Sequence, residues 1–520
     1  AYEAAPPASA PAGAAGGARF AVAGEHEDAR FAAQFRAALA PGQHLRAFDH
    51  AASAALLRDV QDSGLLSLTD VRDNPERFFL AHRLIAADVA DVAPGFWIRF
   101  TVHYNLCMGT VMALGESRHL DELKRIQARG DIGCFGLTER RAGVNSGMVV
   151  ETVATFDPSN DSFVLNTPSE GAAKNWISSG LMANKAVVVA DLRLPDGTSK
   201  GAHAFLVDLR VTQGGELTKG VMTGDMGVKT IANDLDNAWI AFDNVRVPHS
   251  NLLSRYGDVD AATGKYVHKN KSVRNFQMIG QRLFSGRVCV AQAALIFTRK
   301  IFEQTVAYAE GKRCWAPDGS QPVLADLPQL RTLFDEGKET LRVLDTFLSR
   351  VEAALCKVLR SDGTPSAELQ LAIAVAKVAA VERSIALLAR AKADVGSYAL
   401  MADSGFQRVD FLQMCKFAEG DSRILSQKMA RDRMALFARG RAPAGGSSAA
   451  EDALCAELGA ALAAGSESKA ARAKAWQGSW RTVYRLADSV QERVLRAWVA
   501  DSDETARATD AAAPPLQSRL

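Results

Sequence analysis

Hydrophobic positions recur at helical spacing towards both ends of the chain and at strand spacing in its middle. Over 19–130, stretches such as AALLRDVQDSGLLSL and HLDELKRIQARG repeat apolar residues every three or four positions, which predicts helices. From about 131 to 250 the pattern becomes β-rich: MVVETVATFDPSNDSFVLNTP is two such runs around an Asp-Pro-Ser-Asn-Asp turn. The middle of the chain is therefore predicted to be a mostly antiparallel sheet domain.

Long helices are predicted to return over 275–438. One apolar stripe steps by three and four residues through Leu341, Leu344, Leu348, Val351 and Leu355. Thr364 and Pro365 mark the start of the next helix, with Thr as the N-cap and Pro in the first turn. That helix is apolar on more than one face, which is typical of a helix inside a bundle.

The remaining segments divide by composition. The first 18 residues are rich in Ala, Pro and Gly, which predicts disorder, and ARGRAPAGGSSAAED reads as a linker. The full expected organisation is a disordered extension at 1–18, a helical domain at 19–130, a β-domain at 131–250, a helical bundle at 275–438, a linker at 439–452, a short tail of one or two helices at 453–503 and a flexible C-terminus at 504–520.

Composition and charge exclude several classes of function. The chain has 520 residues with a net charge of +2, so no electrostatic case exists for nucleic acid or membrane binding. Seven scattered cysteines without a CxxC pair, and nine histidines without i, i+4 pairing, argue against a metal site. Because no window has 18 uninterrupted apolar residues, no membrane-spanning helix is expected.

Long motifs in the β-rich region resemble one protein family. GCFGLTERRAGVNSG (133–147) is similar to the CFxxTExxxGSN signature of the acyl-CoA dehydrogenase and oxidase superfamily. ETVATFDPSNDSFVLNTPSEGAAKNWISSG (151–180) resembles the oxidase branch almost throughout, and the likeness extends over roughly 60–435. It implies the α+β multi-domain fold of that superfamily: an N-terminal helical domain, a central mostly antiparallel β-domain and a C-terminal bundle of long helices.

The resemblance also implies a bound cofactor, FAD. Thr138 falls where the family's Thr contacts the isoalloxazine ring, and Trp176 and Ser178 fall where an aromatic ring and a hydroxyl pack near flavin N5. Lys312 takes the place of an Arg that reaches the FAD phosphates, and Arg313 follows it. From the residues alone, Trp176 is equally a core residue after a strand, and Thr-Glu is a common dipeptide.

Glu419, in the stretch CKFAEGDSRIL, is the candidate catalytic base. In the family, a Glu followed by Gly near the end of the bundle removes the α-proton of an acyl thioester. A desolvated carboxylate has a raised pKa and suits that task. The competing interpretation is a solvated charge in the acidic first turn of the following helix. The family pattern YEGDN is altered here, with Ala418 and Ser422 in place of Tyr and Asn.

The implied function is FAD-dependent oxidation of a fatty acyl-CoA to trans-2-enoyl-CoA, with O2 as the acceptor and H2O2 as a product, in a homodimer. Two alternatives remain open: a dehydrogenase that uses an electron-transfer flavoprotein, and an inactive structural or regulatory subunit. The inactive alternative is suggested by Asp394 and Val395, which stand where the family has glycines. The tripeptide Ser518-Arg519-Leu520 matches a peroxisomal address. A plastid or mitochondrial location is the alternative if the N-terminus is a processed transit-peptide junction.

Overall fold

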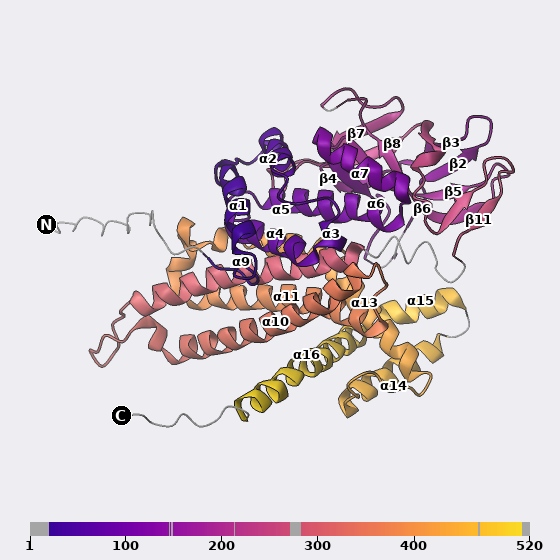
Figure 1. Cartoon of the computed structure of the whole chain (residues 1–520). Helices are drawn as coiled ribbons and strands as arrows, with labels where there is room; N and C mark the ends of the chain where they lie inside the picture. The colour runs from indigo at the N-terminus through magenta and orange to yellow at the C-terminus, as the bar shows by residue number, and fades with distance from the viewer. Residues whose placement is uncertain are drawn as a thin grey trace.

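The chain folds into helices at both ends with strands between them, which confirms the predicted fold class (Figure 1). The computed structural model describes residues 20–144, 146, 149–212, 214–270, 282–465 and 468–511, with side chains as far as 500. The expected disordered extension at 1–18 and the address Ser518-Arg519-Leu520 lie outside the described residues. In Figure 1 the N-terminal helices and the strands lie on one side of the long helices α9–α11, and α14–α16 lie on the other.

The N-terminal part is helical as far as Arg129. Its elements are α1 (Ala29–Leu39), η1 (Ala40–His44), α2 (His50–Asp62), α3 (Asp70–Asp73), α4 (Pro75–Asp88), α5 (Pro94–Thr101), the π-helix η2 (Val102–Met108), α6 (Gly109–Leu114) and α7 (Ser117–Arg129). Helices α4, α5, η2 and α6 are buried almost throughout, because each is covered by other helices or by the sheet.

The β-domain holds two main sheets and one hairpin. The larger sheet runs β1-β5-β2-β3-β9 with β6 also on β5, and a smaller sheet runs β4-β8-β7. Strands β1 and β2 pair with β5 in parallel, and the other pairs are antiparallel. The strands are β1 (Gly133–Gly136), β2 (Val153–Asp157), β3 (Ser162–Asn166), β4 (Lys174–Ser178), β5 (Lys185–Arg193), β6 (Ser199–Asp208), β7 (Val221–Asp225), β8 (Asn237–Phe242), β9 (Val245–Pro248), β10 (Gly257–Val259) and β11 (Tyr266–His268); the short helices η3 (Glu170–Ala172) and η4 (His249–Asn251) lie between them.

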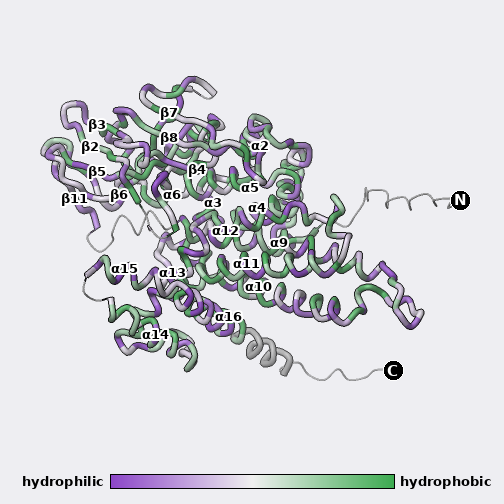
Figure 2. Tube along the Cα trace, turned by 180° about the vertical axis from the view of Figure 1, so that it is seen from behind, coloured by the Kyte–Doolittle hydropathy of each residue, from purple (hydrophilic) through white to green (hydrophobic). Residues whose placement is uncertain are grey.

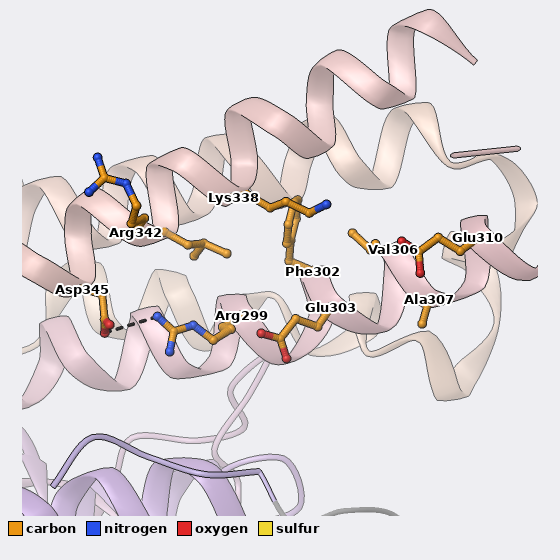
Figure 3. A pocket seen from close by; sticks show the side chains of 10 residues that line it. Arg299, Phe302, Glu303, Val306, Ala307, Glu310, Lys338, Arg342 and Asp345 are labelled. Carbon is orange, nitrogen blue, oxygen red and sulfur yellow. Dashed lines mark ion pairs between the residues drawn. The ribbon is translucent and has the colours of Figure 1, made fainter. Parts of the chain in front are cut away.

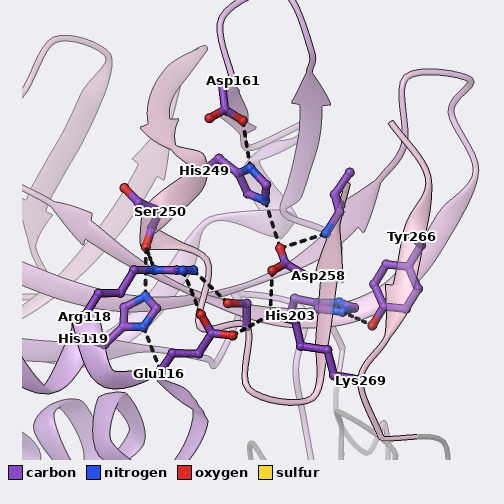
Figure 4. A network of polar contacts seen from close by, with 12 residues as sticks. Glu116, Arg118, His119, Asp161, His203, His249, Ser250, Asp258, Tyr266 and Lys269 are labelled. Carbon is purple, nitrogen blue, oxygen red and sulfur yellow. Dashed lines mark hydrogen bonds and ion pairs between the residues drawn. The ribbon is translucent and has the colours of Figure 1, made fainter. Parts of the chain in front are cut away.

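The antiparallel hairpin β10–β11 lies beyond the β-domain boundary expected at 250 and is tied to the sheet by a polar network (Figure 4). His249 lies between two carboxylates, 2.8 Å from Asp161 and 2.9 Å from Asp258. Lys269 bonds to Asp258 at 2.8 Å and to Glu116, the N-cap residue of α7. The network therefore joins the hairpin, the sheet and the N-terminal helices.

Three long helices form the centre of the C-terminal part. They are α9 (Arg282–Gly311), α10 (Pro328–Arg360) and α11 (Ala367–Asp394), followed by α12 (Asp410–Phe417) and α13 (Ser422–Phe437); the short helices η5 (Leu324–Asp326), η6 (Gly396–Leu400), η7 (Ala402–Ser404) and η8 (Phe406–Arg408) connect them. The predicted stripe on α10 is buried, and α11 is buried on several faces. Hydrophobic positions recur along these helices in Figure 2. Helix α11 is capped by Ser366, two residues later than predicted, because Ser366 Oγ accepts the Leu369 N–H at 3.2 Å.

The C-terminal tail differs from the sequence-based expectation. It contains α14 (Ala449–Ala464), α15 (Lys469–Gly478) and α16 (Trp480–Ala511). Helix α14 begins inside the stretch expected to be a linker, and α16 continues into the stretch expected to be flexible. The cause of the first difference is Glu451, which is buried between Arg433 and Arg493 and so draws this segment against the bundle.

Candidate active site

Glu419 lies in the turn between α12 and α13, at the centre of the helical part. Only 8% of its surface is exposed, so it is not a solvated charge. It precedes α13, whose N-cap is Asp421. The backbone of Glu419 is left-handed, with φ of +56°, and Gly420 follows with φ of +97°. A left-handed conformation costs a non-glycine residue about 1–2 kcal/mol, so surrounding contacts must hold it.

The Glu419 carboxyl group lies against the backbone of α9. A methyl group added to Gly286 would lie 2.3 Å from Glu419 Cδ, so only glycine leaves room for the carboxyl in this position. Its Oε2 atom is buried and has no hydrogen-bond partner in the described part of the chain. Burial raises the pKa of Glu419 to about 8, although Arg287 and Lys377 act to lower it. A buried carboxyl group with a raised pKa and an unpartnered oxygen has the properties that a general base needs.

Two cationic side chains bind the carbonyl groups of this turn. Arg287 of α9 donates from Nε to the Glu419 carbonyl at 3.0 Å, and Lys377 of α11 donates to the Gly420 carbonyl at 2.9 Å. Lys377 is fully buried, and burial lowers its pKa to about 7. Two consecutive carbonyls of the left-handed pair are thus held from two different helices.

The three residues expected at the flavin ring gather on one edge of the β-domain. Asn175 N–H donates to the Thr138 carbonyl at 2.9 Å, which ties the segment after β1 to β4. Trp176 of β4 is left-handed, with φ of +58°, and 58% of its surface is exposed. Ser178 accepts a bond from Asn237 of β8 at 3.3 Å. An exposed indole on strained backbone, beside accessible hydroxyl groups, fits a stacked aromatic cofactor. Because Trp176 is exposed, it is not a core residue, which was the alternative interpretation.

A buried ion pair lies directly beneath this edge. Lys174 Nζ is 2.8 Å from Glu139 Oε1, and both side chains are fully buried. The Glu139 carboxylate also accepts the N–H groups of Glu151 and Thr152 at 2.7 and 2.9 Å. Because Glu139 follows Thr138 and Lys174 precedes Trp176 by two residues, the pair fixes both segments of the expected flavin surface.

Lys312 and Arg313 lie apart from Glu419. Both are exposed and follow the last residue of α9, where Arg313 donates to the Gln321 carbonyl at 3.0 Å. Gly286 and Gly311 are 25 residues apart on this helix, which corresponds to about 37 Å. The structure therefore does not bring these two residues to the part of α9 that contacts Glu419.

A hollow between α9 and α10 is also distinct from the Glu419 site (Figure 3). Its volume is about 460 Å³, and apolar side chains such as Phe302 and Val306 alternate in its lining with charged ones such as Lys338 and Glu310. Within the described residues, no group of His, Cys, Asp and Glu side chains could hold a metal ion, and no helix is long and apolar enough to cross a membrane.

No protein-family model matches the chain. Acyl-coenzyme A oxidase 2, peroxisomal, of Arabidopsis thaliana is 36% identical over 244 residues, which are 45% of this chain and 34% of that protein. The match thus spans about a third of the length of this curated relative.

Two solved structures share the fold over most of the chain. Acyl-CoA oxidase 1 of Yarrowia lipolytica has a TM-score of 0.70 at 20% identity. The match covers 92% of this chain and 77% of the Yarrowia chain. Acyl-CoA oxidase 2 of Caenorhabditis elegans, bound with FAD, ascaroside-CoA and ATP, has a TM-score of 0.73 at 19% identity. The match covers 91% of this chain and 76% of the Caenorhabditis chain. The chain thus shares the fold of these acyl-CoA oxidases, and over part of its length it is similar in sequence to curated proteins that are named acyl-CoA oxidases.

Proposed function

We propose that this protein oxidises fatty acyl-CoA thioesters with Glu419 as the catalytic base. The observation that carries the proposal is the buried Glu419 carboxyl, which has one unpartnered oxygen and a pKa raised by burial to about 8. Such a group can remove a weakly acidic α-proton from a thioester at neutral pH. The curated relatives support the choice of substrate class.

Thr138, Trp176 and Ser178 would hold the ring of FAD, and the Glu139–Lys174 pair would keep their two segments in register. FAD, when bound, supplies the acceptor for the hydride that leaves the β-carbon. Glu419 takes the α-proton on its carboxylate, and the buried turn excludes water from that oxygen. Lys312 and Arg313 are proposed to contact FAD phosphates; because they are far along α9 from Gly286, the FAD they contact would be that of the second copy in a homodimer.

The first experiment is the visible spectrum of the purified protein, before and after incubation with FAD. We expect a flavin band that bleaches when acyl-CoA is added without air. Recovery in air with release of H2O2 would identify O2 as the acceptor, whereas slow recovery would favour the dehydrogenase alternative. A protein that takes up no flavin would contradict both enzyme functions and favour an inactive subunit. The proposed location is the peroxisome, which the name of the Arabidopsis relative carries.

Gly286→Ala tests whether α9 sets the position of the base. The added methyl group would lie 2.3 Å from Glu419 Cδ and must displace the carboxyl. A misplacement of about 1 Å costs a reaction about 100-fold, so the anaerobic bleaching rate should fall by about that factor. Ala favours the helix by up to about 1 kcal/mol, which offsets part of the cost of about 1–3 kcal/mol for overpacking a buried site, so only a small change in the thermal midpoint is expected.

Gly459→Ala is the matched control, because Gly459 lies inside α14 and its added methyl group meets only Met434 at 3.8 Å. It should leave the bleaching rate unchanged. An unchanged rate in Gly286→Ala would mean that the carboxyl position seen here does not matter for the reaction.

A further inference from the structure

Lys377 binds the turn that carries Glu419 through several hydrogen bonds. Its Nζ atom donates to three oxygens: the Lys416 carbonyl at 2.5 Å, the Gly420 carbonyl at 2.9 Å and Ser422 Oγ at 3.0 Å. The Lys416 carbonyl belongs to the last turn of α12, and Ser422 is the first residue of α13. One side chain therefore spans the end of one helix, the turn and the start of the next.

The surroundings of Lys377 show that this arrangement is specific. The side chain is fully buried and projects from α11, whose neighbouring residues are almost all apolar. Burying an ammonium group is strongly unfavourable unless hydrogen bonds compensate it. The carbonyls at the end of a helix lack intrahelical donors and carry partial negative charge. Lys377 supplies the missing donor at the end of α12 and, with the same atom, binds the left-handed Gly420.

We propose that Lys377 is a positioning residue, which holds the α12–α13 turn so that Glu419 keeps its left-handed backbone and its carboxyl stays against Gly286. The inference rests on the proposed role of Glu419, but the conformation of the turn can be tested without substrate or flavin. Lys377 acts through two carbonyls and a hydroxyl of the turn, and neither the substrate nor the reacting atoms need to touch it.

The decisive variant is Lys377→Met, which keeps the length of the side chain and removes its donors. Hydrogen–deuterium exchange of the flavin-free protein is measured at the amides of Ala418 and Leu425, which donate within the turn to Met414 and Asp421. We expect these amides to exchange at least about tenfold faster, because loss of a buried anchor opens the turn locally. The control is Lys392→Met, at an exposed lysine of the same helix, which should leave them unchanged.

Unchanged exchange at Ala418 and Leu425 in folded Lys377→Met would overturn the proposal. If Lys377→Met does not fold, Ser422→Ala decides, because it removes one of the three partners and keeps the buried charge. Exchange of the same amides should then become severalfold faster. An unchanged exchange rate would overturn the proposal.

A second readout separates positioning from general loss of structure. In the flavin-loaded protein, Lys377→Met should slow anaerobic bleaching about 10- to 100-fold and leave the affinity for FAD unchanged. Added to Glu419→Gln, it should cause no further loss, since both changes act through one carboxyl. If the two substitutions lowered the bleaching rate additively, Lys377 would not act through Glu419. Absence of bleaching in the unaltered protein would refute the proposed function. The exchange experiment would still test whether Lys377 holds the turn, because it needs neither flavin nor substrate.

Discussion

Glu419→Gln is expected to lower the rate of anaerobic flavin bleaching by acyl-CoA about 100- to 10,000-fold, the range that a general base contributes. Gln has the same shape and fits against Gly286, but its amide cannot accept the α-proton. FAD should still bind, because the proposed ring contacts come from Thr138, Trp176 and Ser178 of the β-domain. The measurement is stopped-flow absorbance with the flavin-loaded variant. Glu303→Gln, at an exposed glutamate of α9, is the control and should bleach at the normal rate.

The pH dependence of the unaltered protein gives an independent check on the same group. Only the ionised carboxylate can take a proton, and burial raises the pKa of Glu419 to about 8. The bleaching rate should therefore rise with pH, bend near pH 8 and level off above it. A profile that levels off near pH 4–5 would mean that the base is an ordinary exposed carboxylate, and a normal rate in Glu419→Gln would remove Glu419 from the mechanism.

Stability should respond to Glu419→Gln in the opposite direction to activity. The folded pKa of Glu419 is raised above its unfolded value of 4.5, so the unfolded chain releases this proton first. The unaltered protein consequently loses stability as the pH rises from about 4.5 to 8, by up to about 1.4 kcal/mol per pH unit. Gln carries no charge to bury. The variant should therefore gain free energy of unfolding relative to the unaltered protein over this range, measured by urea unfolding at several pH values.

Local sequence patterns predicted the succession of helices, strands and helices because hydrophobic periodicity is set by each segment's own burial. The stripe from Leu341 to Leu355 is buried on α10 as predicted. The starts of α11 and α14 differ from the predicted positions for a physical reason. In Thr364-Pro365-Ser366, both Thr364 and Ser366 can cap a helix, and the choice of Ser366 depends on where α11 packs. Likewise, Glu451 lies in an apparent linker, and its burial between two arginines that are distant in the sequence is a tertiary contact that packs this helix against the bundle.

The candidate site was predictable where it consists of consecutive residues and not where it is assembled from distant ones. The motif around Glu419 pointed to a base, and the segments with Thr138 and Trp176 pointed to one surface. Nothing in the sequence links Gly286 to Glu419, because their contact joins residues 133 positions apart. Lys377 left a weak signal: a single charge inside the run LAIAVAKVAAV. A lysine among apolar residues on every face must find buried acceptors, but the sequence does not say which.

Lys174→Met is expected to destabilise the protein by about 3–5 kcal/mol, because it leaves the Glu139 carboxylate fully buried without its cation. Two backbone N–H groups would remain bonded to Glu139, so the carboxylate cannot simply leave the site. The segments with Thr138 and Trp176 would then lose their common anchor, and the affinity for FAD should fall with the stability. Urea unfolding and flavin titration measure the two effects. Lys124→Met is the control, because Lys124 forms an exposed pair with Asp121, and such pairs contribute at most about 1 kcal/mol.

The double variant Lys174→Met/Glu139→Gln shows whether the cost arises from the unpaired charge or from lost packing. Removing both charges abolishes the buried anion, and a well-packed neutral replacement of a buried ion pair is often nearly neutral in stability. Part of the unfolding free energy should therefore return, although the single Gln oxygen can accept only one of the two backbone N–H groups that bind the two Glu139 oxygens. FAD affinity should return less completely, because Met cannot donate to the Val189 carbonyl that Lys174 binds at 2.7 Å. If the double variant is as unstable as Lys174→Met, the side chains hold this edge by shape alone. If FAD affinity never changes, the Thr138–Trp176 edge is not where the ring binds.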